Sequence, residues 1–366
     1  MFALMERVEI DVERISTSEH SMDLKKYMEK RLPLYYPNKG LEYMVKKGAK
    51  IEVYHEQFDL NAFLEKTKGR TVEVVIDQYG STHQRDYCYV VLGHRFQGRQ
   101  IVQFRGILGE NRLYKILLLL RLAGIPKKQI TLFDYNPDYR EIIAHDLESL
   151  DNSFDYIVIG GNVIIKPFLS ANFTSVTSAH GEIVSYATFQ YSNKKILFTS
   201  YPYGDLCEYV VEELGPKTRK AIMFVGSTGA LDTSFSWGNI VLPSAVYNDT
   251  GSLITQNFPN KLIEQGKDGI KVSNKHLSVK TPVLETLDFI RALKNQGYDT
   301  LDVEVAYFQS GCEQHLPSYA QVGIILFVSD QPGLPSDFSK HDYSSTNILV
   351  IRQYLAQVVE EEIGGN

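Results

Sequence analysis

The stretch Ala221-Ile222-Met223-Phe224-Val225-Gly226-Ser227-Thr228-Gly229-Ala230 decides the fold, because an apolar run in it passes directly into a small polar signature. A short apolar run is typical of a buried strand, and closely spaced glycines favour a tight turn. We therefore expect a buried strand over residues 221–225 that ends in a glycine turn over residues 226–229.

Two further strand ends carry polar signatures. Asp302-Val303-Glu304 stands ahead of the run that begins at Val305, and Ser329-Asp330 closes the apolar run from Gly323 to Val328. In an open parallel α/β sheet, ligands bind beyond the carboxyl ends of the strands. We therefore expect the three signatures to converge on one pocket.

These motifs resemble those of the nucleoside phosphorylase superfamily, whose members share a strand-end Gly-Ser-x-Gly-Gly/Ala turn, a Met-Glu pair and a Ser-Asp pair. Val303-Glu304 stands in the place of the Met-Glu pair. Three other segments resemble the family in the same order, namely residues 194–231, 238–243 and 281–286. The resemblance covers residues 155–366. It implies a nucleoside phosphorylase-like α/β/α domain with a central mixed sheet over residues 153–366.

The resemblance also implies which residues act on a purine nucleoside. Cleavage of an N-ribosidic bond builds positive charge on the sugar and negative charge on the departing base, so a catalyst must protonate the base and hold the sugar. By resemblance, Asp330 is the acid and Glu304 holds the ribose hydroxyls. Burial behind the strand would favour the raised pKa that an acid needs. The implied substrate-binding residues are Gly226, Ser227, Thr228, Leu284, Glu285, Val303 and Ser329.

Each assignment has a structural alternative. Asp330 precedes Gln331-Pro332-Gly333 and is also suited to a turn, and Glu304 is also suited to cap the helix that starts near Ala306. The glycine signature can serve packing alone. Thr281-Pro282 is a good helix start, so helix electrostatics alone explain Glu285 in the first turn of a helix over residues 282–297.

The sequence favours water over phosphate as the acceptor. The hexameric branch of the family has an arginine where this chain has Phe224. Residues 155–366 contain three arginines, none of them at an expected strand end: Arg219, Arg291 and Arg352. Phosphorolysis would need Arg105 or Arg112 to reach the site. The glutamate that positions water in the nucleosidases is also absent, which leaves Glu182 as a candidate.

Composition indicates an ordinary globular protein. Hydrophobic residues make up 43% of the chain and charged residues 22%, and the formal net charge is −6. The excess of acidic residues lies in residues 155–366, which disfavours nucleic-acid binding. No apolar run has membrane-spanning length, and the first residues do not resemble a signal peptide, so we expect a cytoplasmic protein without membrane contact. Three scattered cysteines suggest neither disulfides nor zinc, and we expect them to be buried: Cys88, Cys207 and Cys312.

Residues 1–152 are expected to form a separate α/β domain of unknown role. Strands are predicted at residues 71–77, 87–92, 100–104 and 129–133, and helices at residues 112–123 and 138–150. Three interpretations compete. Arg105-Gly106-Ile107-Leu108-Gly109 with Asp134 resembles a Rossmann-like dinucleotide or methyl-donor site. Residues 98–134 also parallel residues 193–230, which indicates a degenerate half-copy of the second domain. The third is a structural or oligomerisation domain.

The sequence thus predicts cleavage of the N-ribosidic bond of a purine nucleoside or related compound, most simply by hydrolysis. Phosphorolysis is one alternative, and a non-catalytic nucleoside-binding or storage protein is another. The expected partner is a small-molecule nucleoside or base, and we expect a homo-oligomer. No cofactor and no metal are expected.

Overall fold

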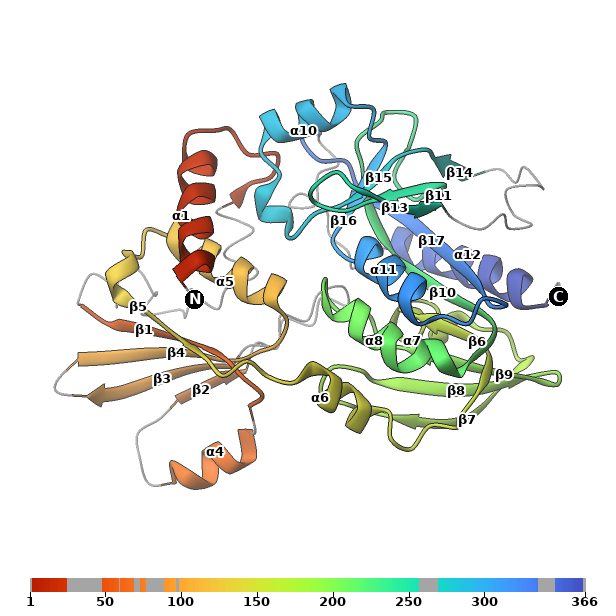
Figure 1. The fold of residues 1–366 in the computed structure, drawn as a ribbon, viewed down its shortest axis with the longest axis horizontal. Coiled ribbons are helices and arrows are strands. Elements are labelled where there is room, and N and C mark those ends of the chain that lie inside the picture. Colours follow the sequence, from red (N-terminus) through yellow and green to blue (C-terminus); the bar gives the residue numbers. More distant parts are fainter. Residues whose placement is uncertain are drawn as a thin grey trace. The chain divides into compact units, whose positions relative to one another are not determined.

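The computed structural model describes residues 2–24, 48–58, 60–68, 73–76, 89–96, 99–256, 269–334 and 346–364. Two compact units make up the chain: unit 1, Met1–Asp138, and unit 2, Tyr139–Asn366 (Figure 1). Each unit has its own sheet. Cys207 and Cys312 are free and buried, as expected, whereas Cys88 lies outside the described residues.

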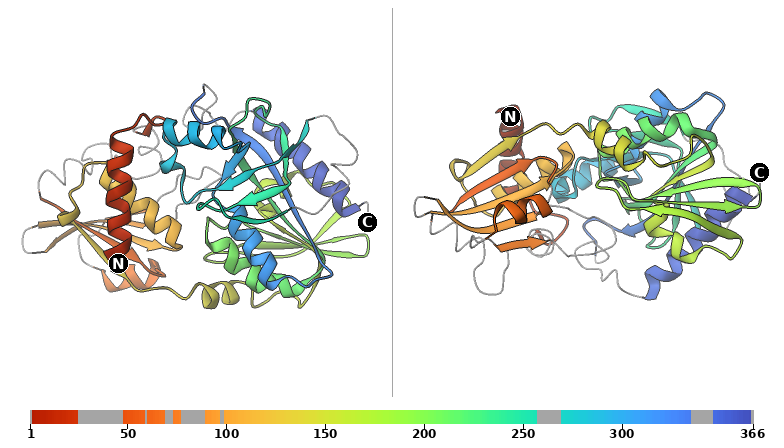
Figure 2. Two further views of the ribbon diagram at one scale, coloured as in Figure 1. Left: turned by 45° about the horizontal axis from the view of Figure 1, so that its top comes forward. Right: turned by 90° about the horizontal axis from the view of Figure 1, so that it is seen from below.

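Unit 1 is built on a five-stranded sheet of order β2-β3-β4-β1-β5. Its strands are β1 (Lys50–His55), β2 (Glu73–Ile76), β3 (Tyr89–Phe96), β4 (Arg99–Ile107) and β5 (Ile130–Asp134), and its described helices are α1 (Phe2–Ser16), α4 (Leu60–Lys66), α5 (Glu110–Leu122) and η1 (Lys127–Gln129). Strand β1 runs parallel to β4 and β5, while β2, β3 and β4 are antiparallel (Figure 2). The strand-helix-strand prediction for residues 100–133 therefore holds.

Helix α5 anchors unit 1. Its residues from Leu113 to Leu120 are buried, and it ends where Gly124 takes a φ of +82°, a conformation that favours glycine. Helix α1 packs along it: Arg121 donates to both carboxylate oxygens of Glu9 at 2.6 and 2.8 Å.

Unit 2 is built on a twelve-stranded mixed sheet. Its strands are β6 (Phe154–Ile159), β7 (Phe173–Ala179), β8 (Tyr186–Tyr191), β9 (Lys194–Thr199), β10 (Thr218–Ala230), β11 (Ile240–Pro243), β12 (Ala245–Tyr247), β13 (Leu253–Gln256), β14 (Ile270–Ser273), β15 (His276–Ser278), β16 (Thr300–Asp302) and β17 (Gln321–Asp330). Its described helices are α6 (Tyr139–Asp146), α7 (Gly161–Ile164), η2 (Lys166–Phe168), α8 (Leu206–Leu214), η3 (Gly215–Lys217), η4 (Pro282–Leu284), α10 (Leu287–Asn295), α11 (Val305–His315) and α12 (Thr346–Gly364).

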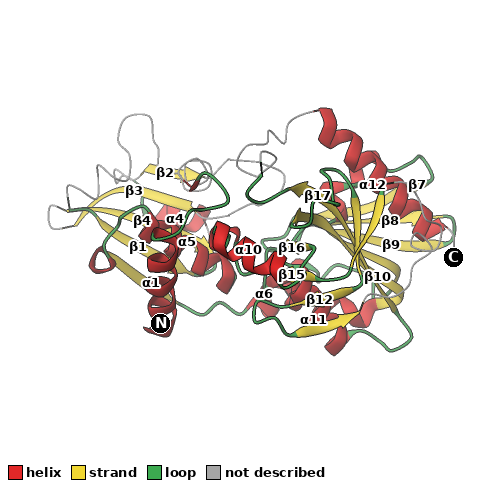
Figure 3. Cartoon of the chain, turned by 90° about the horizontal axis from the view of Figure 1, so that it is seen from above, coloured by secondary structure: helices red, strands yellow, loops and turns green. Residues whose placement is uncertain are grey.

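Strand β10 shows how this sheet is layered. Met223 and Val225 share a core cluster with Leu355 and other residues of α12, whereas Phe224 points to the opposite face and meets Phe308 of α11. Helices α8 and α11 lie side by side, and α12 covers the other face (Figures 1 and 3). The expected α/β/α domain with a central mixed sheet is therefore confirmed.

Three local predictions were wrong. Residues 226–230 are not a turn but the continuation of β10, because β17 pairs with the strand as far as Gly229. Strand β16 is antiparallel to β10, not parallel. The segment after Thr281 forms the short helix η4, and α10 begins only at Leu287, because Thr286 caps it by accepting a hydrogen bond from the backbone N–H of Phe289.

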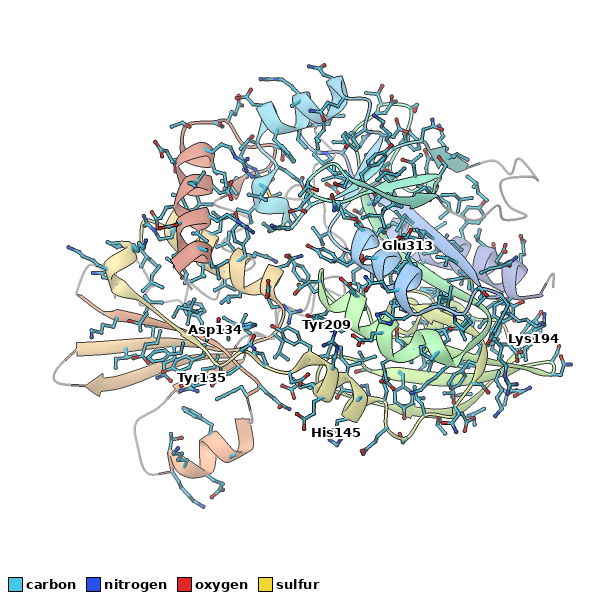
Figure 4. All side chains as sticks on the ribbon, viewed as in Figure 1. Asp134, Tyr135, His145, Lys194, Tyr209 and Glu313 are labelled. Atoms are coloured by element: carbon cyan, nitrogen blue, oxygen red, sulfur yellow. The ribbon has the colours of Figure 1, made fainter. Side chains whose placement is uncertain are left out.

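The two units divide 14 residues before the expected boundary at 152/153, because α6 belongs to unit 2. Its Arg140 donates to Glu212 of α8 at 2.8 Å, and Tyr139 meets Tyr209, which Figure 4 labels, with ring centroids 5.3 Å apart. Asp146, the last residue of α6, accepts hydrogen bonds from three consecutive backbone N–H groups, those of residues 182–184, at 2.7 to 2.9 Å.

The first five strands of the two units share one topology. Unit 2 contains the order β7-β8-β9-β6-β10, which repeats β2-β3-β4-β1-β5 strand for strand. In both units the first strand along the chain lies between the fourth and fifth and is parallel to both, and the other pairs are antiparallel. A helix joins the fourth strand to the fifth in each, α5 in unit 1 and α8 in unit 2.

Candidate functional site

Glu304 lies between β16 and α11, and only one of its two carboxylate oxygens has a hydrogen-bond partner among the described residues. The residue is 2% exposed. Its Oε2 accepts a hydrogen bond from the Tyr201 hydroxyl at 2.9 Å, whereas its buried Oε1 has no hydrogen-bond partner among the described residues. Glu304 occupies the N-cap position of α11 but makes no side-chain cap there. The side chain of Glu304 therefore makes no capping hydrogen bond to α11.

Asp302 supplies the cap instead. Its Oδ2 accepts from the backbone N–H of Val305 at 2.9 Å, and its Oδ1 accepts from the Ser278 hydroxyl at 2.5 Å. The Nε2 of His276 lies 3.1 Å from the same Oδ1. Asp302 is thus held on both oxygens, in contrast to Glu304 two residues later.

Burial raises the pKa of Glu304 well above its ordinary value, and the negative charge of Asp302 raises it further. The hydrogen bond from Tyr201 and the nearby backbone N–H groups of Gly204 and Val303 lower the pKa but are the smaller effects. A carboxyl in this environment binds its proton more tightly than a surface glutamate does.

Tyr201 was not predicted from the sequence as a site residue. It follows β9, keeps part of its surface exposed, and contacts Phe224 with ring centroids 5.4 Å apart. A Cβ atom at Gly226 would lie 2.9 Å from both the ring and the hydroxyl oxygen of Tyr201. The glycine in this position therefore makes room for the tyrosine that holds Glu304. The two bonded residues are 103 positions apart, and no local pattern joins them.

Asp330 is the last residue of β17 and is 7% exposed. The Ser329 hydroxyl donates to its Oδ1 at 2.8 Å, and the register pairs Asp330 with Gly229 of β10. On its other side β10 pairs Gly229 with Leu301 of β16. Asp330 and the segment that leads to Glu304 therefore flank the same end of β10.

The other predicted residues fall into two groups. Within β10, the Thr228 hydroxyl donates to the carbonyl of Leu301 at 2.8 Å, which ties two strands together, whereas Ser227 keeps part of its surface exposed. Strand alternation places Ser227 on the face opposite Gly226. Outside β10, Val303 belongs to a core cluster, and Glu285 is buried between η4, which ends at Leu284, and α10. Their contacts with a ligand stay predictions.

The described part of residues 155–366 places no arginine at the end of β6, β10, β16 or β17. Arg219 is exposed near the start of β10, and Arg291 pairs with Asp288 at 2.8 Å. Burial in α12 lowers the pKa of Arg352. In unit 1, Arg105 pairs with Glu56 at 2.7 Å and lies over the Tyr54 ring. Glu182, the candidate water ligand, is exposed on the β7–β8 connection.

Neither a metal centre nor a membrane span is found where the structure is described. No group of three His, Cys, Asp or Glu side chains in these residues is arranged to hold a metal ion. None of the described helices combines the length and apolar character that crossing a bilayer requires.

Solved structures resemble this chain at low sequence identity. A uridine phosphorylase from Vibrio fischeri is 15% identical, with 62% of this chain and 97% of that chain covered, at a TM-score of 0.47. A purine nucleoside phosphorylase from Toxoplasma gondii is 14% identical, over 58% and 90% of the two chains, at 0.45. A methylthioadenosine/S-adenosylhomocysteine nucleosidase from Colwellia psychrerythraea is 19% identical, over 56% and 96%, at 0.40.

All three belong to the superfamily that the sequence motifs resemble. A scan against protein-family models gave no match, and neither did a search of curated proteins.

Proposed function

We propose that unit 2 cleaves the N-ribosidic bond of a purine nucleoside or a related compound, and that water is the acceptor. Glu304 holds the sugar, and Asp330 protonates the departing base. The reaction needs no cofactor in this scheme, because both charges that develop in the transition state meet a carboxyl group of the chain.

The observation that carries the proposal is the unpartnered oxygen of Glu304. A buried polar atom without a partner is costly to the fold, and native proteins keep few of them. Oε1 is buried and without a hydrogen-bond partner among the described residues, beside an oxygen that Tyr201 already holds. A sugar hydroxyl donating to Oε1 would satisfy it and would favour the ionised carboxylate.

Asp330 is suited to the second role by its place. It is buried at the end of β17, next to the end of β10 that the segment leading to Glu304 also flanks. An acid on one side of the site and a sugar acceptor on the other match the two ends of the bond to be cleaved.

Water fits the site better than phosphate does. Phosphate is usually held by charge-assisted, bidentate contacts from arginine. At the position where the hexameric phosphorylases have that arginine, Phe224 packs between Tyr201 and Phe308. These three aromatic side chains supply no positive charge that could hold an anion.

The test is the release of free base from adenosine, inosine and methylthioadenosine by the full-length chain, with and without phosphate. The proposal predicts equal rates in both conditions and a free sugar as product. Release that requires phosphate and yields ribose 1-phosphate would replace hydrolysis by phosphorolysis. Binding without any release would support a silent nucleoside-binding protein instead.

A further inference from the structure

We propose that His276 is a positioning residue for Glu304. It holds the carboxyl of Asp302, and through Asp302 it fixes the start of α11, where Glu304 presents its own carboxyl to the sugar. This inference rests on the proposed function, because it adds a residue that orients the sugar ligand of the same site. His276 itself contacts neither the sugar nor the base in this scheme.

The polar residues of β15 and β16 share one face of the sheet. The two strands are parallel neighbours (Figure 1), and their register pairs His276 with Thr300 and Ser278 with Asp302. Strand alternation places these four side chains on the same face, and all four are buried. The residues between them, on the opposite face, belong to an apolar core cluster. Buried positions are usually apolar, so core packing alone does not explain this polar face.

A chain of contacts runs across this face to the carboxyl of Asp302. The Oγ1 of Thr300 lies 2.9 Å from Nδ1 of His276, and Nε2 of His276 lies 3.1 Å from Oδ1 of Asp302. The hydroxyl of Ser278 donates to the same Oδ1 at 2.5 Å. The imidazole ring is therefore held at one nitrogen by Thr300 and contacts the carboxyl through the other.

The chain of contacts ends at the start of α11. The Oδ2 of Asp302 accepts a hydrogen bond from the backbone N–H of Val305 at 2.9 Å, and the Oγ of Ser278 accepts one from the backbone N–H of Ala306 at 2.8 Å. Glu304 lies between Asp302 and Val305 in the sequence, so the first of these bonds closes a loop around it. A shift of the Asp302 carboxyl would therefore move the backbone that carries Glu304.

Stability is a poor explanation for the contact between His276 and Asp302. Replacing a buried ion pair by apolar residues of similar volume is often neutral or stabilising. The negative charge of Asp302 also raises the pKa of Glu304, and so opposes the ionised form that binds a hydroxyl most strongly. What the contact provides is a fixed start of α11. Such precision matters in a site, because a misplacement of about 1 Å can cost about a hundredfold in rate.

The experiment compares two ligands of the full-length protein, an unreactive purine C-nucleoside and its free base. The ratio of their affinities reports the hold on the sugar, because the base is common to both, and a general loss of folded protein leaves this ratio unchanged. Glu304→Ala should lower the nucleoside-to-base ratio about tenfold or more, since it removes the charge-assisted contact. His276→Leu should lower the ratio by at least about threefold, because a displaced Glu304 keeps only part of that contact.

Two further variants separate positioning from stability. The matched control is Leu277→Ala, which removes a buried side chain from the opposite face of β15, and it should destabilise the fold but leave the ratio unchanged. In the double variant Glu304→Ala/His276→Leu, the second substitution should cause no further loss, because His276 acts on the sugar only through Glu304.

Three results would overturn the positioning role while the proposed function stands: an unchanged ratio in a folded His276→Leu variant, an equal loss in Leu277→Ala, or a further loss in the double variant. If His276→Leu does not fold, Ser278→Ala removes the other side-chain contact to Oδ1 and the bond to Ala306, and it should lower the ratio in the same way. If the parent does not bind the C-nucleoside, or if Glu304→Ala leaves the ratio unchanged, the proposed function itself fails.

Discussion

Two carboxyl groups two residues apart have opposite roles in this protein. Asp302 has hydrogen bonds on both oxygens and caps the start of α11, whereas Glu304 is also buried but has one oxygen without a partner among the described residues. An unsatisfied buried carboxyl destabilises the fold, and a ligand that satisfies it recovers that free energy. Stability is therefore a readout for Glu304 that needs no substrate.

The pH dependence of stability should reveal this cost. Because the pKa of Glu304 is raised in the folded state, the unfolded chain releases this proton first, and the free energy of unfolding falls as pH rises above about 4.5. Glu304→Gln removes the ionisable group, so its stability should exceed that of the parent at about pH 8 and approach it at about pH 4.

Chemical denaturation at several pH values measures the difference. Glu313→Gln, on the exposed surface of the same helix and labelled in Figure 4, is the matched control. A gap between Glu304→Gln and the parent that does not grow with pH would show that Glu304 titrates normally.

The variant Asp330→Asn should distinguish a role of Asp330 as the catalytic acid from a purely structural role. If Asp330 protonates the base, the variant should lose cleavage of purine nucleosides by about a hundredfold or more but keep cleavage of a nitrophenyl riboside, whose leaving group needs no proton. Steady-state rates on both substrates decide this. Equal losses would mean that Asp330 acts only in holding the end of β17.

At the scale of elements, β10 runs from the core of unit 2 to the candidate site. Its close packing leaves no room for a side chain at Gly160, the residue that follows β6. Gly160 follows β6 with a φ of +88°, and a Cβ atom there would lie 2.1 Å from the carbonyl oxygen of Val225. Gly297 has a similar φ of +78° after α10, but nothing lies within 4 Å of its Cβ position.

Gly297→Ala should therefore cost only the backbone strain, about 1–2 kcal/mol. Gly160→Ala should cost clearly more, because β10 must also move. The free energies of unfolding of the two variants, each against the parent, measure the difference. Equal costs would mean that the β6–β10 contact is looser than the structure has it.

Local patterns predicted the elements well and their pairing poorly. The apolar run at residues 221–225 gave the strand, but the glycines at 226 and 229 suggested a turn, because pairing with β16 and β17 comes from residues 70 to 100 positions away. Motifs alone predicted Glu304 and Asp330 as site residues. No local pattern pointed to Tyr201, whose hydrogen bond to Glu304 joins residues 103 positions apart. The cap at Thr286 was a signal in the sequence that we missed.

At the scale of the whole molecule, the repeated strand order suggests how the chain is built. We propose that unit 1 is an incomplete second copy of the first half of unit 2. The described residues of unit 1 contain no counterparts of β16 and β17, the strands that deliver Glu304 and Asp330. At its own strand ends, His55 and Asp134 pair at 2.8 Å. Only unit 2 has the proposed catalytic residues.

The division at Asp138 can be tested with two fragments. Residues 139–366 keep α6, whereas residues 153–366 lose Asp146 and with it three hydrogen bonds to the backbone of residues 182–184. Because these bonds go to a charged group, the shorter fragment should be less stable by roughly 3 kcal/mol. Thermal unfolding compares the two, and equal melting temperatures would move the boundary back to residue 152.

The central claim is that Glu304 holds the sugar of a nucleoside while its bond to the base breaks, and one comparison tests it most directly. The rate of base release is measured for the full-length protein and for Glu304→Ala, with circular dichroism to show that both are folded. Loss of the charge-assisted contact should lower turnover at least about a hundredfold, or on the order of 3 kcal/mol of transition-state stabilisation. An unchanged rate in a folded Glu304→Ala variant would contradict the account.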